Sequence, residues 1–511
     1  MKQRALPLAA LRGAVAGAAA GLAFAAAMRQ SGALVTVASI VHASPAGLDF
    51  VAHLLVAAAV GAGFGTLVSS ERLGVGELLF WGLTYGMVWW FVGALTVAPM
   101  LLAGRAIWTV AAAQAALPSL FGHLWYGAIT ALIYAAITPG PSDGRPRVTG
   151  GTVGAGVLAG VAGAWLLERL IATQSPWLGT TGLSLATSSP AHRFVFLTGV
   201  LGGLVFALLY PQPRDAAGPG LIRGALFGFV WWAAAALSAL PEINGGGLAW
   251  SLEAVRARFP ALPAFVLYGG LVALVYRWLL AAGRLLFADD ATPRDEEGTG
   301  TRGLRAIGRG AFAGLIGGLV FTLVMVRVGF LPTVAQIVGA ASPWSGFLVH
   351  LVIANIIGAS YGLLFLGRSV GTGSALGWGV SYGFFWWILG PLTLLPVLLG
   401  GAPRWTPQVA GALIPSLVGH LAYGGAVGIV FYLLEVRYNP WWVPHTELMA
   451  AQSERRRAEV LASASALWVL VVMLGLTLPI MLACGMAPAY SGTATARGAY
   501  GQSSGEAGPC P

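Results

Sequence analysis

Four histidines occupy matching places in an otherwise apolar chain of 511 residues. His53 and His350 each follow a Ser-Pro pair, and His123 and His420 each stand in a Gly-His-Leu motif further along. Ionisable side chains are costly inside a membrane span, so they are candidate functional residues wherever they occur there. We therefore interpret the pairs His53 with His123 and His350 with His420 as the candidate site.

Two imidazoles at the same depth in one helical bundle can hold a b-type haem. At 1.5 Å per residue, both histidines of a pair would lie roughly 10–12 Å below the outer surface. A bis-histidine haem places one imidazole on each face of the iron. Arg105 and Arg404 stand in predicted outer loops, where they could contact the haem propionates. The sequence thus favours haem b as a cofactor, with the four histidines as metal ligands.

Other interpretations of the pairs stay open. A buried histidine can simply donate to a neighbouring helix, a contact worth on average about 0.6 kcal/mol in a membrane. A bare copper or zinc ion is less favoured, because no carboxylate or cysteine accompanies the pairs at that depth. Ligation of a chlorophyll-type magnesium by single histidines is a further alternative.

The remaining candidates for chemistry are weaker. We expect His42 in an external loop and His445 in an interfacial segment, both solvated. Cys484 and Cys510 are the two cysteines; both are expected outside, where they could form a disulfide.

The segment of the chain between His123 and His350 has a similar pattern but no histidine pair. Phe265 stands where the later histidine is expected, and Leu197 or Thr198 where the earlier one is expected. His192 lies too close to the predicted helix start. Residues common to all three stretches are therefore interpreted as packing, and the histidine pairs as an added property.

Composition places these residues in a lipid bilayer. Hydrophobic residues make up 57% of the chain and charged residues 9%, against about 25% charged in a soluble domain. Most of the 28 Lys and Arg residues fall on one predicted side, which is typical of cytoplasmic loops and predicts no nucleic-acid partner. We expect a bacterial inner-membrane protein with a cytoplasmic N-terminus and an external C-terminal tail.

Internal repetition supplies the elements that position the histidines. A Tyr/Phe-Gly motif leads into a Trp-Trp pair three times, ending at Trp90, Trp232 and Trp387, and a proline follows each time. The sequence predicts three parallel repeats of four membrane helices at residues 1–140, 150–284 and 308–437.

The parts between and after these repeats are predicted separately. Residues 287–309 are expected to form a solvated linker, and residues 438–462 a cytoplasmic interfacial segment. A thirteenth membrane helix is predicted at 463–484, followed by an external disordered tail at 485–511. The predicted fold class is thus all-α integral membrane protein, with three tandem parallel four-helix repeats plus a C-terminal thirteenth helix.

Glycines recur every four residues in two of the predicted first helices. Such spacing gives a helix face against which a neighbouring backbone can pack closely. The glycines are Gly13, Gly17 and Gly21 in the first repeat, and Gly310, Gly314 and Gly318 in the third.

The histidine motifs carry a family resemblance. A Ser-Pro pair, a second-helix histidine and then Gly-His-Leu with Tyr-Gly resemble small bacterial inner-membrane proteins of the YagU type. The matching residues are His53 with Phe121-Gly122-His123-Leu124, and His350 with Val418-Gly419-His420-Leu421. The resemblance implies a four-helix unit and no activity.

Three classes of function are compatible with these patterns. The first is a haem-binding electron-transfer subunit whose partners are other membrane redox subunits or quinone. The second is a transporter or channel for a small solute, which the parallel repeats and scarce intramembrane acids disfavour. The third is a membrane scaffold or assembly subunit with structural histidines. No motif of a stand-alone enzyme is present, and a redox subunit of a membrane enzyme complex stays open.

Overall fold

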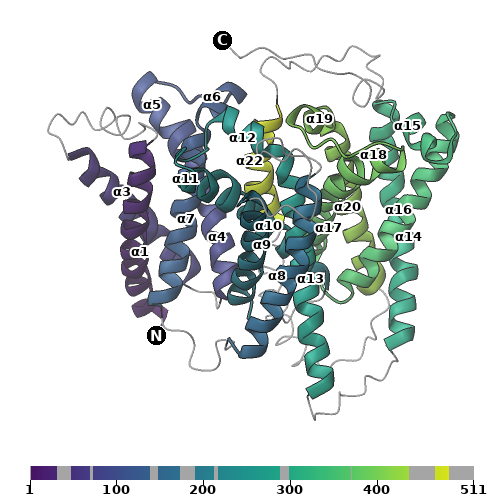
Figure 1. Cartoon of the computed structure of the whole chain (residues 1–511), viewed down its shortest axis with the longest axis horizontal. Coiled ribbons are helices and arrows are strands. Elements are labelled where there is room, and N and C mark those ends of the chain that lie inside the picture. Colours follow the sequence, from purple (N-terminus) through teal and green to yellow (C-terminus); the bar gives the residue numbers. More distant parts are fainter. Residues whose placement is uncertain are drawn as a thin grey trace.

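The computed structural model describes residues 2–30, 48–69, 73–138, 148–172, 190–211, 217–287, 299–369, 371–436 and 466–482. All regular elements in these ranges are helices (Figure 1). The predicted segments 438–462 and 485–511 lie outside the described residues, as do His42, His445, Cys484 and Cys510.

The first predicted repeat contains four long helical segments. Its third segment is interrupted by a π-helical turn, η1, and a short helix, α6, precedes the fourth. The elements are α1 (Lys2–Gln30), α3 (Leu48–Val68), α4 (Val75–Val92), η1 (Gly93–Val97), α5 (Ala98–Ala103), α6 (Val110–Ala115) and α7 (Leu117–Ile137).

The second predicted repeat has the same order of elements, again with a π-helical turn after the Trp-Trp pair. The elements are α8 (Gly150–Ala172), α9 (Pro190–Leu209), α10 (Ala217–Trp232), η3 (Ala233–Ala239), α11 (Leu240–Ile243), α12 (Leu252–Arg258), the 3₁₀ turn η4 (Phe259–Ala261) and α13 (Leu262–Phe287).

The third predicted repeat adds two short helices, α15 and η5, between its first and second long helices. Its elements are α14 (Thr299–Arg327), α15 (Leu331–Ala335), η5 (Gln336–Val338), α16 (Pro343–Phe365), α17 (Thr372–Leu389), η6 (Gly390–Leu394), α18 (Leu395–Leu398), α19 (Pro407–Ala412) and α20 (Ile414–Val436). Helix α14 begins at Thr299, so the basic end of the predicted linker 287–309 is helical.

Hydropathy and length identify the membrane-crossing helices among these elements. In the described part of the chain, 11 helices are long and apolar enough to span a bilayer. Two further apolar helices, Arg193–Leu209 and Ala466–Met481, are shorter. The chain is therefore a multi-pass membrane protein in contact with lipid, and its described part is all-helical.

The same long-range hydrogen bonds recur in the three predicted repeats. The second tryptophan of each Trp-Trp pair donates to a backbone oxygen 26 residues later, at 3.1 Å in every case. A tyrosine on the last long helix donates to a backbone oxygen of the second, 69 residues earlier. These tyrosine bonds are Tyr126 to Ala57, Tyr268 to Gly199 and Tyr423 to Ala354.

The glycine faces predicted from the sequence lie where two helix backbones touch. A β-carbon on Gly61 of α3 would collide with the Gly13 oxygen of α1. One on Gly358 of α16 would collide with the Gly310 oxygen of α14. Because backbone atoms cannot move aside as a flexible side chain can, these positions require glycine for the helices to pack this closely.

The last helix contacts segments of all three predicted repeats. It comprises the π-helical turn η7 (Val469–Leu474) and α22 (Gly475–Met481), and lies near the middle of the bundle in Figure 1. Gln114 of α6 donates to the Pro479 and Leu482 oxygens, and Arg256 of α12 donates to the Leu482 oxygen at 2.9 Å. These bonds satisfy carbonyls that a helix end otherwise leaves unpaired.

The third repeat approaches the same helix end without a polar side chain. A β-carbon on Gly411 of α19 would lie 2.5 Å from the Met481 oxygen. Gln114, Arg256 and Gly411 stand at equivalent places, since each lies 12 residues before the tyrosine that donates across 69 residues. The end of α22 is therefore held at three corresponding positions.

We predict that Gly358→Ala lowers the free energy of unfolding by about 1–3 kcal/mol, the usual range for an overpacked core. The added methyl group would force α14 and α16 apart. Thermal unfolding of the detergent-solubilised protein measures the effect. Gly303→Ala is the control, because open space surrounds Gly303. Equal melting temperatures for the two variants would contradict the prediction.

Candidate functional site

Each histidine pair lies on the second and fourth long helices of its predicted repeat. His53 and His123 lie within the first two turns of α3 and α7. His350 and His420 lie within the first three turns of α16 and α20. Both members of a pair are therefore near the same end of the bundle.

A phenylalanine from the first helix contacts both imidazoles of each pair. The Phe24 ring centroid lies 5.6 Å from that of His53 and 4.9 Å from that of His123. The Phe321 centroid lies 5.2 Å from that of His350 and 4.6 Å from that of His420. All four contacts are edge-on. The phenylalanine thus occupies space beside both rings.

The glycine of each Gly-His-Leu motif makes room for this phenylalanine. A β-carbon on Gly122 would collide with the Phe24 ring, and one on Gly419 with the Phe321 ring. In this motif the histidine therefore supplies the imidazole, and the glycine before it leaves the space that the phenylalanine ring fills.

Hydrogen bonds determine which nitrogen of the later histidine is protonated. The Nδ1 of His123 lies 2.8 Å from the Ser119 backbone oxygen, and the Nδ1 of His420 lies 2.8 Å from that of Ser416. A carbonyl oxygen only accepts, so Nδ1 is the donor, and Nε2 of a neutral ring carries a lone pair. Nε2 makes no hydrogen bond within the described part of the chain.

The free nitrogen of the later histidine faces a π-helical turn. A β-carbon on Gly390, the first residue of η6, would lie 3.7 Å from Nε2 of His420. The corresponding distance from Gly93 of η1 to Nε2 of His123 is 3.9 Å. Glycine at the π-helical turn therefore leaves space beside each lone pair. Turns of this kind are frequent at functional sites.

The earlier histidine of each pair has the opposite tautomer. Nε2 of His53 donates to the Gly21 oxygen at 3.1 Å, and Nε2 of His350 donates to the Gly318 oxygen at 3.0 Å. Nδ1 of the neutral ring is then unprotonated. Each pair accordingly holds two imidazoles that are each anchored by one nitrogen and able to accept through the other.

A cavity of about 180 Å³ adjoins the pair in the third repeat. Its walls are almost entirely apolar, and the side chains of both histidines line it. Other lining residues are Phe321, Trp386, Gly390 and Tyr423. Residues Phe330, Val334 and Ile337, from the connection between α14 and α16, also line it.

The second repeat nearly lacks this space. The corresponding cavity is about 10 Å³, and its lining includes Val195, Ala235 and Phe265. Val195 replaces the earlier histidine, Ala235 the π-turn glycine and Phe265 the later histidine, in the register set by the tyrosine hydrogen bonds. In the described part of the chain, the sizeable cavity therefore adjoins the histidine pair of the third repeat, and the equivalent place in the second repeat is nearly filled.

This register corrects one sequence prediction. The expected position of the missing second-helix histidine was Leu197 or Thr198, counted from the Ser-Pro pair. The backbone contacts identify Val195 instead, because Tyr268 bonds Gly199 as Tyr423 bonds Ala354. The Ser-Pro pair stands at a different sequence distance from the bonded oxygen in each repeat, so it does not fix the register.

Arg105 and Arg404 lie in exposed loops, before α6 and α19 respectively. Their role as partners of haem propionates stays a prediction.

The donor set bears on which metals the site suits. Within the described residues, no group of three or more His, Cys, Asp or Glu side chains could hold an ion. His123 and His420 are oriented as ligating histidines often are, with Nδ1–H on a carbonyl and Nε2 free. His53 and His350 donate through Nε2, the nitrogen that would ligate. A cavity of 180 Å³ also suits one six-membered ring better than a porphyrin.

The phenylalanines are the site residues that the sequence interpretation missed. Phe24 and Phe321 each stand three residues after the last glycine of the four-residue series, and Leu167 is their counterpart in the second repeat. The sequence contains a signal for this role. Phenylalanine occurs in the two repeats that have a histidine pair, and leucine replaces it in the repeat that has none.

Comparisons of the chain with protein-family models, with curated proteins and with solved structures found no match.

We predict opposite tautomers within each pair, detectable in the ¹⁵N chemical shifts of histidine-labelled protein. His420 and His123 should show a protonated Nδ1, and His350 and His53 a protonated Nε2. Assignment uses the variants His420→Gln and His350→Gln, each of which removes one set of signals. A single common tautomer for His350 and His420 would contradict the hydrogen-bond assignment.

Proposed function

We propose that the chain folds as three tandem four-helix repeats around a thirteenth membrane helix. The recurring tryptophan and tyrosine hydrogen bonds support this arrangement. The 11 long apolar helices and the two shorter ones together supply the required spans. The distribution of Lys and Arg favours an N-terminus in the cytoplasm and a tail outside, and the resemblance to YagU-type proteins favours a bacterial inner membrane.

We further propose that this protein binds a small lipophilic ring compound that carries hydroxyl groups, of the quinol type. The observation that carries the proposal is the cavity of about 180 Å³ beside His350 and His420, against about 10 Å³ at the same place in the second repeat. An apolar cavity of about 150 Å³ is enough to bind benzene, so one substituted ring fits.

The chemistry of the lining favours a hydrogen-bond donor as ligand. Nε2 of His420 and Nδ1 of His350 can accept, and both imidazoles are already oriented by backbone carbonyls. A hydroxyl that donates to Nε2 in this apolar setting forms a bond that water does not compete for. A quinol offers such hydroxyls, whereas its oxidised quinone offers only acceptors.

The first repeat carries the same polar arrangement. His53, His123 and Phe24 make the contacts that His350, His420 and Phe321 make, with distances that differ by only a few tenths of an ångström. We therefore propose a second site of the same kind there. The second repeat has no such site, and its role in this proposal is to pack against the rest of the helix bundle.

Haem binding is the second candidate function. The Nδ1–H to carbonyl bonds of His123 and His420 favour it, because they present Nε2 as a metal ligand. A haem held by both members of a pair would need the earlier imidazole to turn and the phenylalanine to move. An electron-transfer role with redox partners depends on this haem. Transport, scaffolding and kinship with YagU-type proteins stay predictions.

We predict that methylhydroquinone quenches the tryptophan fluorescence of the purified protein through Trp386, and that His420→Leu weakens its binding about 3–10-fold. This range corresponds to the loss of one hydrogen bond of ordinary net strength. Methylbenzoquinone, which has almost the same size but no hydroxyl, should bind more weakly to the unmodified protein.

Phe265→Leu is the matched control, since Phe265 holds the place of His420 in the second repeat. It should leave the dissociation constant unchanged. Equal affinities for quinol and quinone, or equal affinities of His420→Leu and the unmodified protein, would refute the quinol site.

The haem candidate is tested by a reduced-minus-oxidised visible spectrum of protein purified from haem-replete cells. If the candidate is correct, we expect Soret and α-band absorption approaching two haems per chain, lost stepwise in His123→Leu and His420→Leu. Protein without these bands would exclude haem and leave the quinol site as the remaining proposal for the pairs.

A further inference from the structure

A second polar group lies where the three predicted repeats meet, near the face of the bundle at which α1 begins. It comprises Glu77 in the first turn of α4, Tyr210 after α9, Arg223 in α10 and Arg368 in the connection between α16 and α17. We call these four residues the arginine junction. It lies toward the opposite end of the helices from the histidine pairs and is independent of the proposed quinol site.

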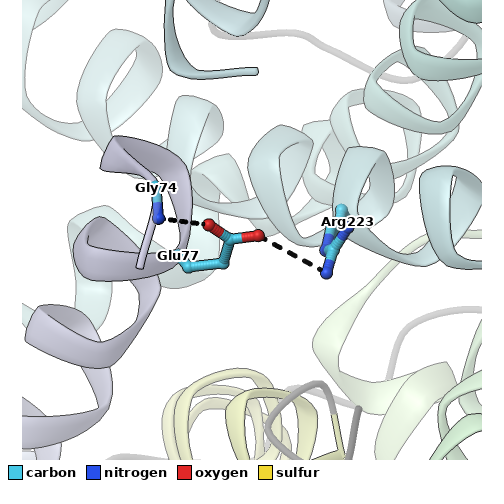
Figure 2. A network of polar contacts seen from close by, with 3 residues as sticks. All are labelled: Gly74, Glu77 and Arg223. Carbon is cyan, nitrogen blue, oxygen red and sulfur yellow. Dashed lines mark hydrogen bonds and ion pairs between the residues drawn. The ribbon is translucent and has the colours of Figure 1, made fainter. Parts of the chain in front are cut away.

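One ion pair joins the first two repeats at the junction. Nη2 of Arg223 lies 3.7 Å from Oε1 of Glu77, and Oε2 of Glu77 accepts from the Gly74 backbone N–H at 2.7 Å (Figure 2). Arg223 is only 9% exposed. The carboxylate therefore has both oxygens engaged, one of them by a buried guanidinium.

The third repeat brings a second guanidinium to this place. A β-carbon on Gly218 of α10 would lie 2.8 Å from the Leu364 oxygen, so α10 begins against the end of α16. Arg368 follows shortly in the chain and is half-buried. Burial lowers the pKa of Arg368, and the positive charge of Arg223 lowers it further. The two guanidinium groups thus repel each other across the interface.

Among the four residues of the junction, positive charge exceeds negative charge by one, because Arg223 and Arg368 are cationic and Glu77 is the one carboxylate. Within the described residues, Glu77 is the carboxylate that pairs with Arg223, and no ion pair of the Arg368 side chain is formed. Two like charges in a partly buried site cost free energy unless a counter-charge lies between them. A site of this kind is complementary to an anion.

A buried hydroxyl adds a neutral donor. The guanidinium carbon of Arg223 lies 5.8 Å from the centre of the Tyr210 ring. The Tyr210 hydroxyl is buried and has no hydrogen-bond partner within the described part of the chain. Buried hydroxyls are normally hydrogen-bonded, so this orphan points to a missing partner.

We propose that the arginine junction binds a phosphate group. A phosphate offers several acceptor oxygens to the Arg223 and Arg368 guanidinium groups and to the Tyr210 hydroxyl, and its charge removes the repulsion between the arginines. The group belongs either to the headgroup of an anionic lipid or to a soluble phosphate. Basic pockets between membrane helices are known to bind lipid headgroups in this way.

The test uses the full-length protein in nanodiscs of three kinds. These contain phosphatidylcholine alone, phosphatidylcholine with phosphatidylglycerol, or phosphatidylcholine with inorganic phosphate added to the buffer. The measurement is the shift of the melting temperature relative to phosphatidylcholine alone. Native mass spectrometry, in parallel, measures how much phosphatidylglycerol stays bound after detergent extraction.

We expect retention of phosphatidylglycerol to fall about tenfold in Arg368→Gln and Tyr210→Phe, the loss of one charge-assisted or buried hydrogen bond. Arg368→Lys, which keeps the charge, should retain part of the binding. Arg302→Gln is the control, because Arg302 is an exposed arginine near the same face. In phosphatidylcholine alone, Arg368→Gln should melt no lower than the unmodified protein, since it removes a repulsion.

The outcomes separate the sources of the phosphate. Stabilisation by phosphatidylglycerol alone identifies a lipid headgroup, and stabilisation by inorganic phosphate as well identifies a site for soluble phosphate. Equal loss of binding in Arg302→Gln and Arg368→Gln would show general attraction to a charged surface and overturn the proposal. So would the absence of any shift in the unmodified protein.

Discussion

The bundle depends on side-chain donors that reach the backbone carbonyls of neighbouring helices. Tyr126, Tyr268 and Tyr423 each bond an oxygen on the second helix of their repeat, and three tryptophans bond the start of the fourth. In the hydrocarbon core such a donor cannot form a hydrogen bond to water instead, so each bond to a carbonyl fixes the register of two helices. The histidines are held by the same means, and their depth follows from the register.

Much of this arrangement could be predicted from residue types and spacing. Glycines at four-residue intervals indicated close helix contact, and Gly13 and Gly310 do lie against the backbones of Gly61 and Gly358. The histidines could be placed at a common end because each follows a recognisable helix start. These signals are local, because the residues of one helix are enough to recognise each of them.

Features that depend on two distant segments were harder to predict. The register of the second repeat was wrong because Pro190 begins its helix, while the bond between Tyr268 and Gly199 fixes the pairing. Phe24 was missed because its role appears only when α1, α3 and α7 are packed together. The ion pair of Glu77 with Arg223 joins two repeats, and the spacing within either repeat gives no hint of it.

The hydrogen bonds to the end of α22 have a consequence for biosynthesis. Gln114 and Arg256 belong to segments made long before this helix, yet their partners are carbonyls of Pro479, Ile480 and Leu482. In chain order the three predicted repeats enter the membrane first, so the place of α22 must stay open or be held by lipid until this helix arrives. Assembly is therefore completed from the outside inward, with the central helix inserted last.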